Sequence, residues 1–297
     1  MEHVTSPASS PQRIVFIDVD GTILEHGSVI APSTVAAIRQ ARANGHLVYL
    51  CTGRSEGDIH PDVRDIGFDG AITNGGAFAT RGDELVLTHT MPRADVERLV
   101  SYFEEHGIHY FLQSHELVYA SPGVLGMMSD FLRQRAARRA EDLKHIGGDA
   151  EDLLDAVLRE ASDRYTPVAE ADLDAIAKAV FVSGHSDSVD RAQHDLGERF
   201  HVIPGSMPLP GGSNGEIALR GTNKGAAIVE MLELLGLDAA DAVGIGDSWN
   251  DVEMFEVCGT SVAMGGADPQ LKALADRVTT GVLDDGVRNA LVSLGLI

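Results

Sequence analysis

The stretch Ile14-Val15-Phe16-Ile17-Asp18-Val19-Asp20-Gly21-Thr22 decides the fold of this chain. Its four leading apolar residues predict a strand that is buried on both faces of a sheet. Asp18 follows at the carboxyl end of that strand, where open α/β sheets bind their ligands. Asp20 is the second acid, and Gly21 lets the chain turn back sharply. Two neighbouring carboxylates repel each other, so a compensating positive charge is expected beside them.

Taken alone, this pentapeptide, Asp18-Val19-Asp20-Gly21-Thr22, is also compatible with a plain polar turn or with a calcium-binding loop. The spacing argues against calcium. An EF-hand loop that starts at Asp18 needs glycine sixth and glutamate twelfth, where this chain has Ile23 and Val29.

Three further polar clusters follow apolar, strand-like runs and decide against the plain turn. They are Thr52-Gly53-Arg54 after residues 46–51, Lys224-Gly225 after residues 216–219, and Gly246-Asp247-Ser248-Trp249-Asn250-Asp251 after residues 242–245. The carboxyl ends of parallel strands meet at one edge of a sheet, so these side chains are expected to converge there.

Strands alternate with helical patterns at both ends of the chain, which predicts an α/β fold. Expected helices over 33–43 and 224–235 separate expected strands over 13–17, 46–51 and 241–245. This order predicts a doubly wound, mainly parallel, Rossmann-like sheet with helices on both faces. The expected parts are a polar, disordered tail over 1–12, a core formed by 13–85 and 219–297, and an inserted α+β domain over 86–218.

In their order along the chain, these clusters resemble the haloacid dehalogenase superfamily of phosphoryl-transfer enzymes. The matching residues are the aspartate, the threonine, the lysine and the Gly-Asp-x-x-Asn-Asp ending. Ile72-Thr73-Asn74-Gly75-Gly76 and the stretch 262–267 resemble its Cof-type phosphatases, which carry a large α/β cap. That branch usually has asparagine where this chain has Gly266, and the effect of this departure is open. The resemblance implies that the insert is a cap that sets substrate specificity.

The acidic residues predict a bound Mg²⁺. A carboxylate that attacks a phosphate dianion at about 4 Å faces roughly 8 kcal/mol of repulsion at an effective dielectric near 20, so a divalent cation is expected. The resemblance implies that Asp18 is nucleophile and metal ligand, that Asp20 binds metal through its backbone carbonyl, and that Asp247 binds through its side chain. It makes Asp251 an outer or occasional ligand. The side chain of Asp20 is assigned as general acid and base.

Four residues are expected to hold the phosphoryl oxygens: Thr52, Gly53, Lys224 and Asn250. A hydroxyl, a backbone N–H and an ammonium suit that charge, whereas Asn250 could instead orient Asp247. A Walker loop is excluded because Lys224 is followed by Gly225 and no Gly-x-x-x-x-Gly precedes it. Taken singly, each of these residues could be an ordinary turn or surface residue. For Arg54 and Asn74, a structural role and a substrate contact are equally open.

Composition limits the partners. The 23 basic and 45 acidic residues among 297 give a formal charge of −22, which disfavours nucleic acid and anionic membranes. No apolar run is long enough to span a bilayer, the first residues lack the apolar core of a signal peptide, and only two cysteines, Cys51 and Cys258, are present. A cytoplasmic protein is therefore expected. The sequence gives no oligomeric state.

Together these patterns predict a Mg²⁺-dependent phosphatase that hydrolyses small phosphorylated metabolites, such as sugar or cofactor phosphates, through an aspartyl-phosphate on Asp18. Two alternatives stay open. One is a sugar phosphomutase of the same superfamily, and the other is a non-catalytic phosphate-sensing protein on the same fold.

Overall fold

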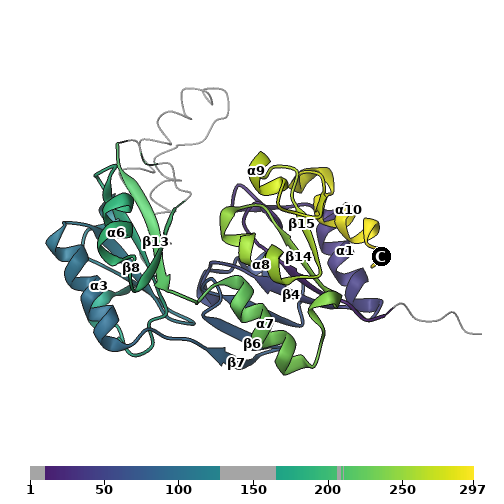
Figure 1. Ribbon diagram of the computed structural model, residues 1–297, viewed down its shortest axis with the longest axis horizontal. Helices are drawn as coiled ribbons and strands as arrows, with labels where there is room; N and C mark the ends of the chain where they lie inside the picture. The colour runs from purple at the N-terminus through teal and green to yellow at the C-terminus, as the bar shows by residue number, and fades with distance from the viewer. Residues whose placement is uncertain (1–10, 128–164, 206–208, 210) are drawn as a thin grey trace, which may run out of the picture. The chain divides into compact units, whose positions relative to one another are not determined.

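The computed structural model describes residues 11–127, 165–205, 209 and 211–297, so nearly all of the tail expected over 1–12 lies outside the described residues. The chain divides into two compact units (Figure 1). The core unit comprises Met1–Gly53, Ile59–Leu87 and Asn223–Ile297. The insert unit comprises Arg54–Asp58 and Thr88–Thr222.

The core unit contains an eight-stranded sheet in the order β16-β15-β14-β1-β4-β5-β6-β7. The pairings from β16 to β5 are parallel, and β6 joins β5 antiparallel. The strands are β1 (Ile14–Ile17), β4 (Leu47–Cys51), β5 (Gly70–Thr73), β6 (Phe78–Arg81), β7 (Glu84–Thr88), β14 (Ala242–Gly246), β15 (Thr260–Ala263) and β16 (Arg277–Val278).

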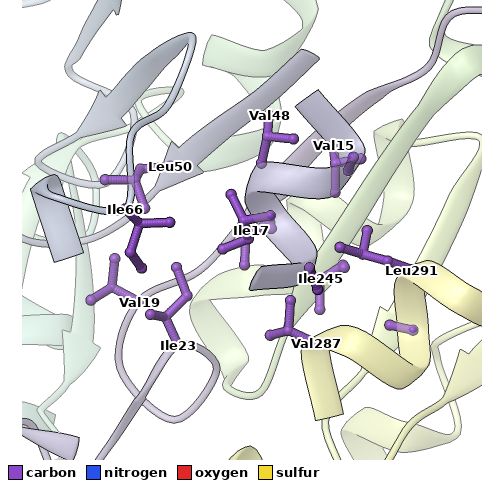
Figure 2. Close-up of a cluster of buried hydrophobic side chains, with 14 of the residues drawn as sticks. Val15, Ile17, Val19, Ile23, Val48, Leu50, Ile66, Ile245, Val287 and Leu291 are labelled. Carbon is purple, nitrogen blue, oxygen red and sulfur yellow. The ribbon is translucent and has the colours of Figure 1, made fainter. Parts of the chain in front are cut away.

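Helices cover both faces of this sheet. Alternate residues of β1 point to opposite faces and enter two different apolar clusters, each of which includes residues of helices. Val15 and Ile17 pack with α1 (Pro32–Ala43) and α10 (Gly286–Ser293), which lie side by side in Figure 1. Figure 2 shows side chains of this first cluster meeting between strands and helix. The residues labelled there include Val15, Ile17, Val48, Ile245, Val287 and Leu291.

On the other face, Ile14 and Phe16 pack with α7 (Lys224–Leu235) and α8 (Val252–Val257). The prediction of a doubly wound, mainly parallel sheet is therefore confirmed. Shorter elements complete the core unit: β2 (Leu24–Glu25) pairs with β3 (Val29–Ile30), and α2 (Pro61–Arg64) and α9 (Pro269–Lys272) are single turns.

The insert unit has a six-stranded sheet in the order β10-β9-β8-β11-β13-β12. One of its faces packs against α3 (Arg93–Glu105) and α6 (Ser188–Leu196). Its strands are β8 (His109–Gln113), β9 (Val118–Ala120), β10 (Thr166–Pro167), β11 (Lys178–Ser183), β12 (Phe200–Pro204) and β13 (Ser213–Leu219). This mixture of strands and helices matches the α+β texture expected for the insert.

One strand belongs to a different sheet from the one expected. The insert was expected to begin at residue 86, but this stretch forms β7, at the edge of the core sheet. It follows β6 through a short turn in which Gly82 has φ +56°, so no long crossover is needed to add it. The run at 216–219 that precedes the Lys224 cluster is the end of β13 in the insert sheet, in keeping with the insert expected over 86–218. Lys224 therefore does not follow a core strand.

Two short helical elements lie within residues 55–65. A 3₁₀ turn covers Glu56–Asp58, and α2 begins at Pro61. Proline has no backbone N–H to continue a preceding helix and suits the first position of a new one. The 3₁₀ turn belongs to the insert unit, whereas α2 belongs to the core unit.

Candidate active site

Lys224 is the centre of the candidate site. It is the first residue of α7, whose N-terminus is capped by Asn223 Oδ1 accepting the Ala226 N–H at 2.8 Å. Its Nζ donates to Asp18 Oδ1 and to Asp251 Oδ1, both at 2.6 Å, and the side chain is 1% exposed. Burial alone would lower the pKa of Lys224, but the Asp18 and Asp251 carboxylates raise it well above its ordinary value. The lysine is therefore a fixed cation between two acids.

Asp18 lies at the carboxyl end of β1, as predicted. Its N–H donates to Ile245 O on β14 at 2.9 Å, which continues the parallel ladder to the last residue before the turn. Burial raises the pKa of Asp18 well above its ordinary value, with Asp251 and Asp247 adding to the rise and Lys224 opposing it. A carboxylate in this position needs further positive charge to stay ionised.

Asp251 is held entirely by the protein. Its Oδ1 accepts from Lys224, and its Oδ2 accepts the N–H groups of Asp247 and Ser248, both at 3.0 Å. A Cβ at Gly246 would lie 2.4 Å from the Asp251 Cγ, so the strand can approach this carboxylate only with glycine there. These contacts orient the loop that carries Asp247. The use of Asp251 as a metal ligand stays a prediction.

Ser248 and Asn250 extend the same turn. Ser248 Oγ donates to Asn250 Oδ1 at 2.7 Å, and that oxygen lies 3.5 Å from the Lys224 Nζ. Ser248 also forms a capping box with Asp251. Ser248 was not among the predicted site residues, although serine three residues before an acid at a helix start is the signature of that motif.

The acids converge on a place that suits a hard cation. Oxygen atoms of Asp18, Asp247 and Asp251 lie within 4.8 Å of one another. Asp247 Oδ1 is buried and has no hydrogen-bond partner among the described residues. Burial, and then the charge of Asp251, raises the pKa of Asp247 to about 7. A bound divalent cation would satisfy the orphaned oxygen and hold both raised carboxyls ionised, so the residues present fit Mg²⁺.

Gly21 makes this arrangement possible. It has φ +82°, in the left-handed region, and a Cβ there would lie 2.0 Å from Asp247 Oδ2. Asp20, just before it, is exposed, and its backbone bridges to Leu24 at the start of β2. The Asp20 side chain is therefore exposed at the same edge of the sheet as Asp18.

Thr52 and Gly53 follow β4, the parallel neighbour of β1. The register pairs Ile17 with Leu50, so Asp18 and Thr52 leave the sheet at the same edge. Thr52 is buried, and its N–H donates to Ile72 O at 2.8 Å. The phosphate-binding roles of Thr52 and Gly53 stay predictions.

Two residues with open roles have structural contacts. Arg54 Nη1 donates to Asp58 O at 2.9 Å within the insert unit. Asn74 is buried with φ +51° in the turn between β5 and β6. The following Gly76 approaches the start of α7 so closely that a Cβ would lie 2.1 Å from Asn223 O. This Asn-Gly-Gly turn therefore supports the residue next to Lys224.

A cavity of about 290 Å³ opens beside Asp247, lined also by Gly21, Glu25 and Gly266. A Cβ at Gly266 would meet no atom within 4 Å. The glycine that departs from the Cof-type pattern thus leaves open space next to the acidic cluster.

Comparison with known proteins identifies the class. The family described as haloacid dehalogenase-like hydrolase matches residues 15–291, and the chain belongs to it. Pyridoxal phosphate phosphatase YbhA of Escherichia coli is 26% identical over 286 residues, covering 95% of this chain and 98% of YbhA. The 5-amino-6-(5-phospho-D-ribitylamino)uracil phosphatase YwtE of Bacillus subtilis is 26% identical over 281 residues, covering 93% and 95%.

Solved structures agree on the fold. The haloacid dehalogenase subclass IIB sugar phosphatase BT4131 has a TM-score of 0.73 at 21% identity, covering 96% of this chain and all of its own. A haloacid dehalogenase-like hydrolase from B. subtilis has a TM-score of 0.75 at 22% identity, covering 95% and 100%. The predicted family and the predicted enzyme class, a phosphoric monoester hydrolase, are confirmed. No helix in the described ranges is long and apolar enough to cross a bilayer.

Proposed function

We propose that this protein is a Mg²⁺-dependent phosphatase of small phosphorylated metabolites that works through an aspartyl-phosphate on Asp18. The observation that carries the proposal is the Lys224 ammonium, held at 2.6 Å from both Asp18 and Asp251 beside the Asp247 carboxylate. The relatives that match nearly the full length of this chain include phosphatases of pyridoxal phosphate and of a ribitylaminouracil phosphate.

The Asp18 and Asp247 carboxylates and the backbone carbonyl of Asp20 would hold the Mg²⁺. When bound, the ion supplies positive charge against the repulsion between Asp18 and the phosphate dianion. Lys224 adds a permanent cation, which is screened from water by its burial. The Thr52 hydroxyl, the Gly53 N–H and the Asn250 amide would orient the phosphoryl oxygens.

In the first step, an Asp18 carboxylate oxygen forms a bond to phosphorus as the bond to the leaving oxygen breaks. Asp20 donates its proton to the leaving alkoxide, which departs as an alcohol. In the second step, Asp20 takes a proton from water, and the water oxygen attacks phosphorus. The bond from phosphorus to Asp18 then breaks, which releases inorganic phosphate and restores both aspartates.

The test is phosphate release from a panel of phosphorylated metabolites with and without Mg²⁺, using the wild type and Asp18→Asn. We expect Mg²⁺-dependent turnover that Asp18→Asn lowers by more than a thousandfold, since loss of the nucleophile removes several kcal/mol of transition-state stabilisation. Turnover above about a tenth of wild type in Asp18→Asn would contradict the assignment of the nucleophile. Isomerised sugar phosphate in place of free phosphate would indicate the phosphomutase.

A further inference from the structure

The chain has a single tryptophan, Trp249, and it is 51% exposed. Tryptophan has the largest apolar side chain and is usually mostly buried. Here about half of the indole lies in water on the 3₁₀ turn Trp249–Asp251, within the motif that carries Asp247 and Asn250. The proposed steps above do not use this side chain.

The turn that carries Trp249 is rigid. Asp251 accepts the N–H groups of Asp247 and Ser248 at 3.0 Å and is itself bound to Lys224. The Ser248 hydroxyl bridges to Asn250 at 2.7 Å. The backbone that carries the indole is thus fixed before a ligand arrives, so less conformational entropy is lost when a ligand packs on the ring than on a ring carried by an unconstrained loop.

Trp249 also lies next in sequence to a residue of the proposed phosphate site. Consecutive Cα atoms are about 3.8 Å apart, and the neighbouring Asn250 places its Oδ1 3.5 Å from the Lys224 Nζ. A group esterified to a phosphate at Asp18 and Lys224 would therefore start within a side chain's length of the Trp249 backbone. The acidic surroundings favour a neutral or cationic group there over a second anion.

We propose that Trp249 determines substrate specificity by stacking on a planar heteroaromatic leaving group. This inference rests on the proposed phosphatase function and narrows its substrates to phosphate esters that carry such a ring. An indole face attracts electron-poor and cationic rings, which the nearby carboxylates also favour. Stacking of a base on an aromatic side chain corresponds to roughly a 5- to 150-fold gain in affinity.

The kinetic test compares kcat/KM for pyridoxine 5′-phosphate with kcat/KM for glycerol 3-phosphate. We expect the ratio of the two to fall at least fivefold in Trp249→Leu and to recover in Trp249→Phe, which keeps an aromatic face. Leu274→Ala is the matched control, because Leu274 is an apolar residue of the core unit with 55% exposure, and its ratio should equal that of wild type. An unchanged ratio in Trp249→Leu would overturn the inference, since a purely structural role would lower both values equally.

A binding measurement separates this inference from the proposed function. In the Asp18→Asn background with Mg²⁺, calorimetric titration should give a dissociation constant for pyridoxine 5′-phosphate that Trp249→Leu raises at least fivefold, with glycerol 3-phosphate affected less than twofold. If the wild type released phosphate from no ester, the phosphatase proposal would fail, and this titration would still decide the stacking role. Equal weakening of both ligands would refute that role.

Discussion

Replacement of Lys224 by methionine would remove the one described cation that touches both Asp18 and Asp251. Each contact at 2.6 Å corresponds to about 6 kcal/mol of Coulomb attraction at an effective dielectric near 20, most of which offsets the desolvation of the charges. Loss of one member of a buried ion pair leaves the others unpaired, which typically costs about 3–5 kcal/mol. We expect Lys224→Met to lower the free energy of unfolding by that amount and kcat/KM by about 10²–10³.

The strictest test of this prediction is whether Asp251→Asn raises or lowers the free energy of unfolding when it is added to Lys224→Met. Asp251→Asn removes a charge that Lys224→Met would leave buried and unpaired, so the double variant should be more stable than Lys224→Met alone. Urea unfolding followed by the fluorescence of Trp249 reports on the core unit. Lys272→Met is the control, because Lys272 is partly buried and donates to Gly265 O rather than to an acid; it should cost about 1 kcal/mol. A double variant less stable than Lys224→Met would refute the proposed charge balance.

Three further changes test the site and the core. Gly21→Ala should raise the Mg²⁺ concentration needed for half-maximal phosphate release at least tenfold, because the new Cβ would lie 2.0 Å from Asp247 Oδ2. Gly27→Ala is the control and should leave that concentration unchanged, because Gly27 has a similar φ of +78° but a Cβ there would meet no atom within 4 Å. Addition of Mg²⁺ should raise the melting temperature of the wild type and have little effect on Asp247→Asn, since a ligand stabilises the state that binds it; equal shifts in calorimetry would contradict this ligand assignment. Burial, aided by the charge of Arg13, lowers the pKa of His46, whose Nδ1 accepts the Arg13 N–H at 3.2 Å. Because the unfolded chain protonates first, the free energy of unfolding should be highest above about pH 6.5, fall as the pH drops below it and level off below the folded pKa; His46→Asn should flatten that slope in urea titrations.

The parts of the fold predicted well are those fixed by local pattern. The helix expected over 224–235 is α7 at the same residues. Asn223 and Gly236 mark its two ends, and the apolar residues between them mark its middle. The buried run Ile14–Ile17 likewise needs no knowledge of its neighbours to be a strand. Each signal lies within a few residues of the element it defines.

The error in sheet membership concerns β7. The pattern of side chains along β7 shows that it is extended, but it carries little information about the partner strand. By contrast, β13 pairs with β11 and β12 in the insert, as the expected insert over 86–218 requires. Because β7 lies at the boundary between the two units, a change of texture along the chain was a poor guide to its sheet.

In the candidate site, too, some features follow from the sequence pattern and others depend on the three-dimensional contacts of single atoms. The order of the motifs was enough to predict that Asp18 and Asp247 meet at one edge of the sheet, because the carboxyl ends of the parallel strands β1 and β14 share that edge. Lys224 joins them from the first residue of α7, which follows a strand of the insert. The resemblance implied that Asp247 binds the metal and that Asp251 is an outer or occasional ligand, but the spacing of the two acids gave no physical reason for the difference. Asp251 accepts three hydrogen bonds from the protein, while Asp247 keeps a buried oxygen without a partner among the described residues. That difference depends on the 3₁₀ turn between them. Asp251 positions the lysine and the loop, while Asp247 keeps the oxygen that the proposed Mg²⁺ would bind.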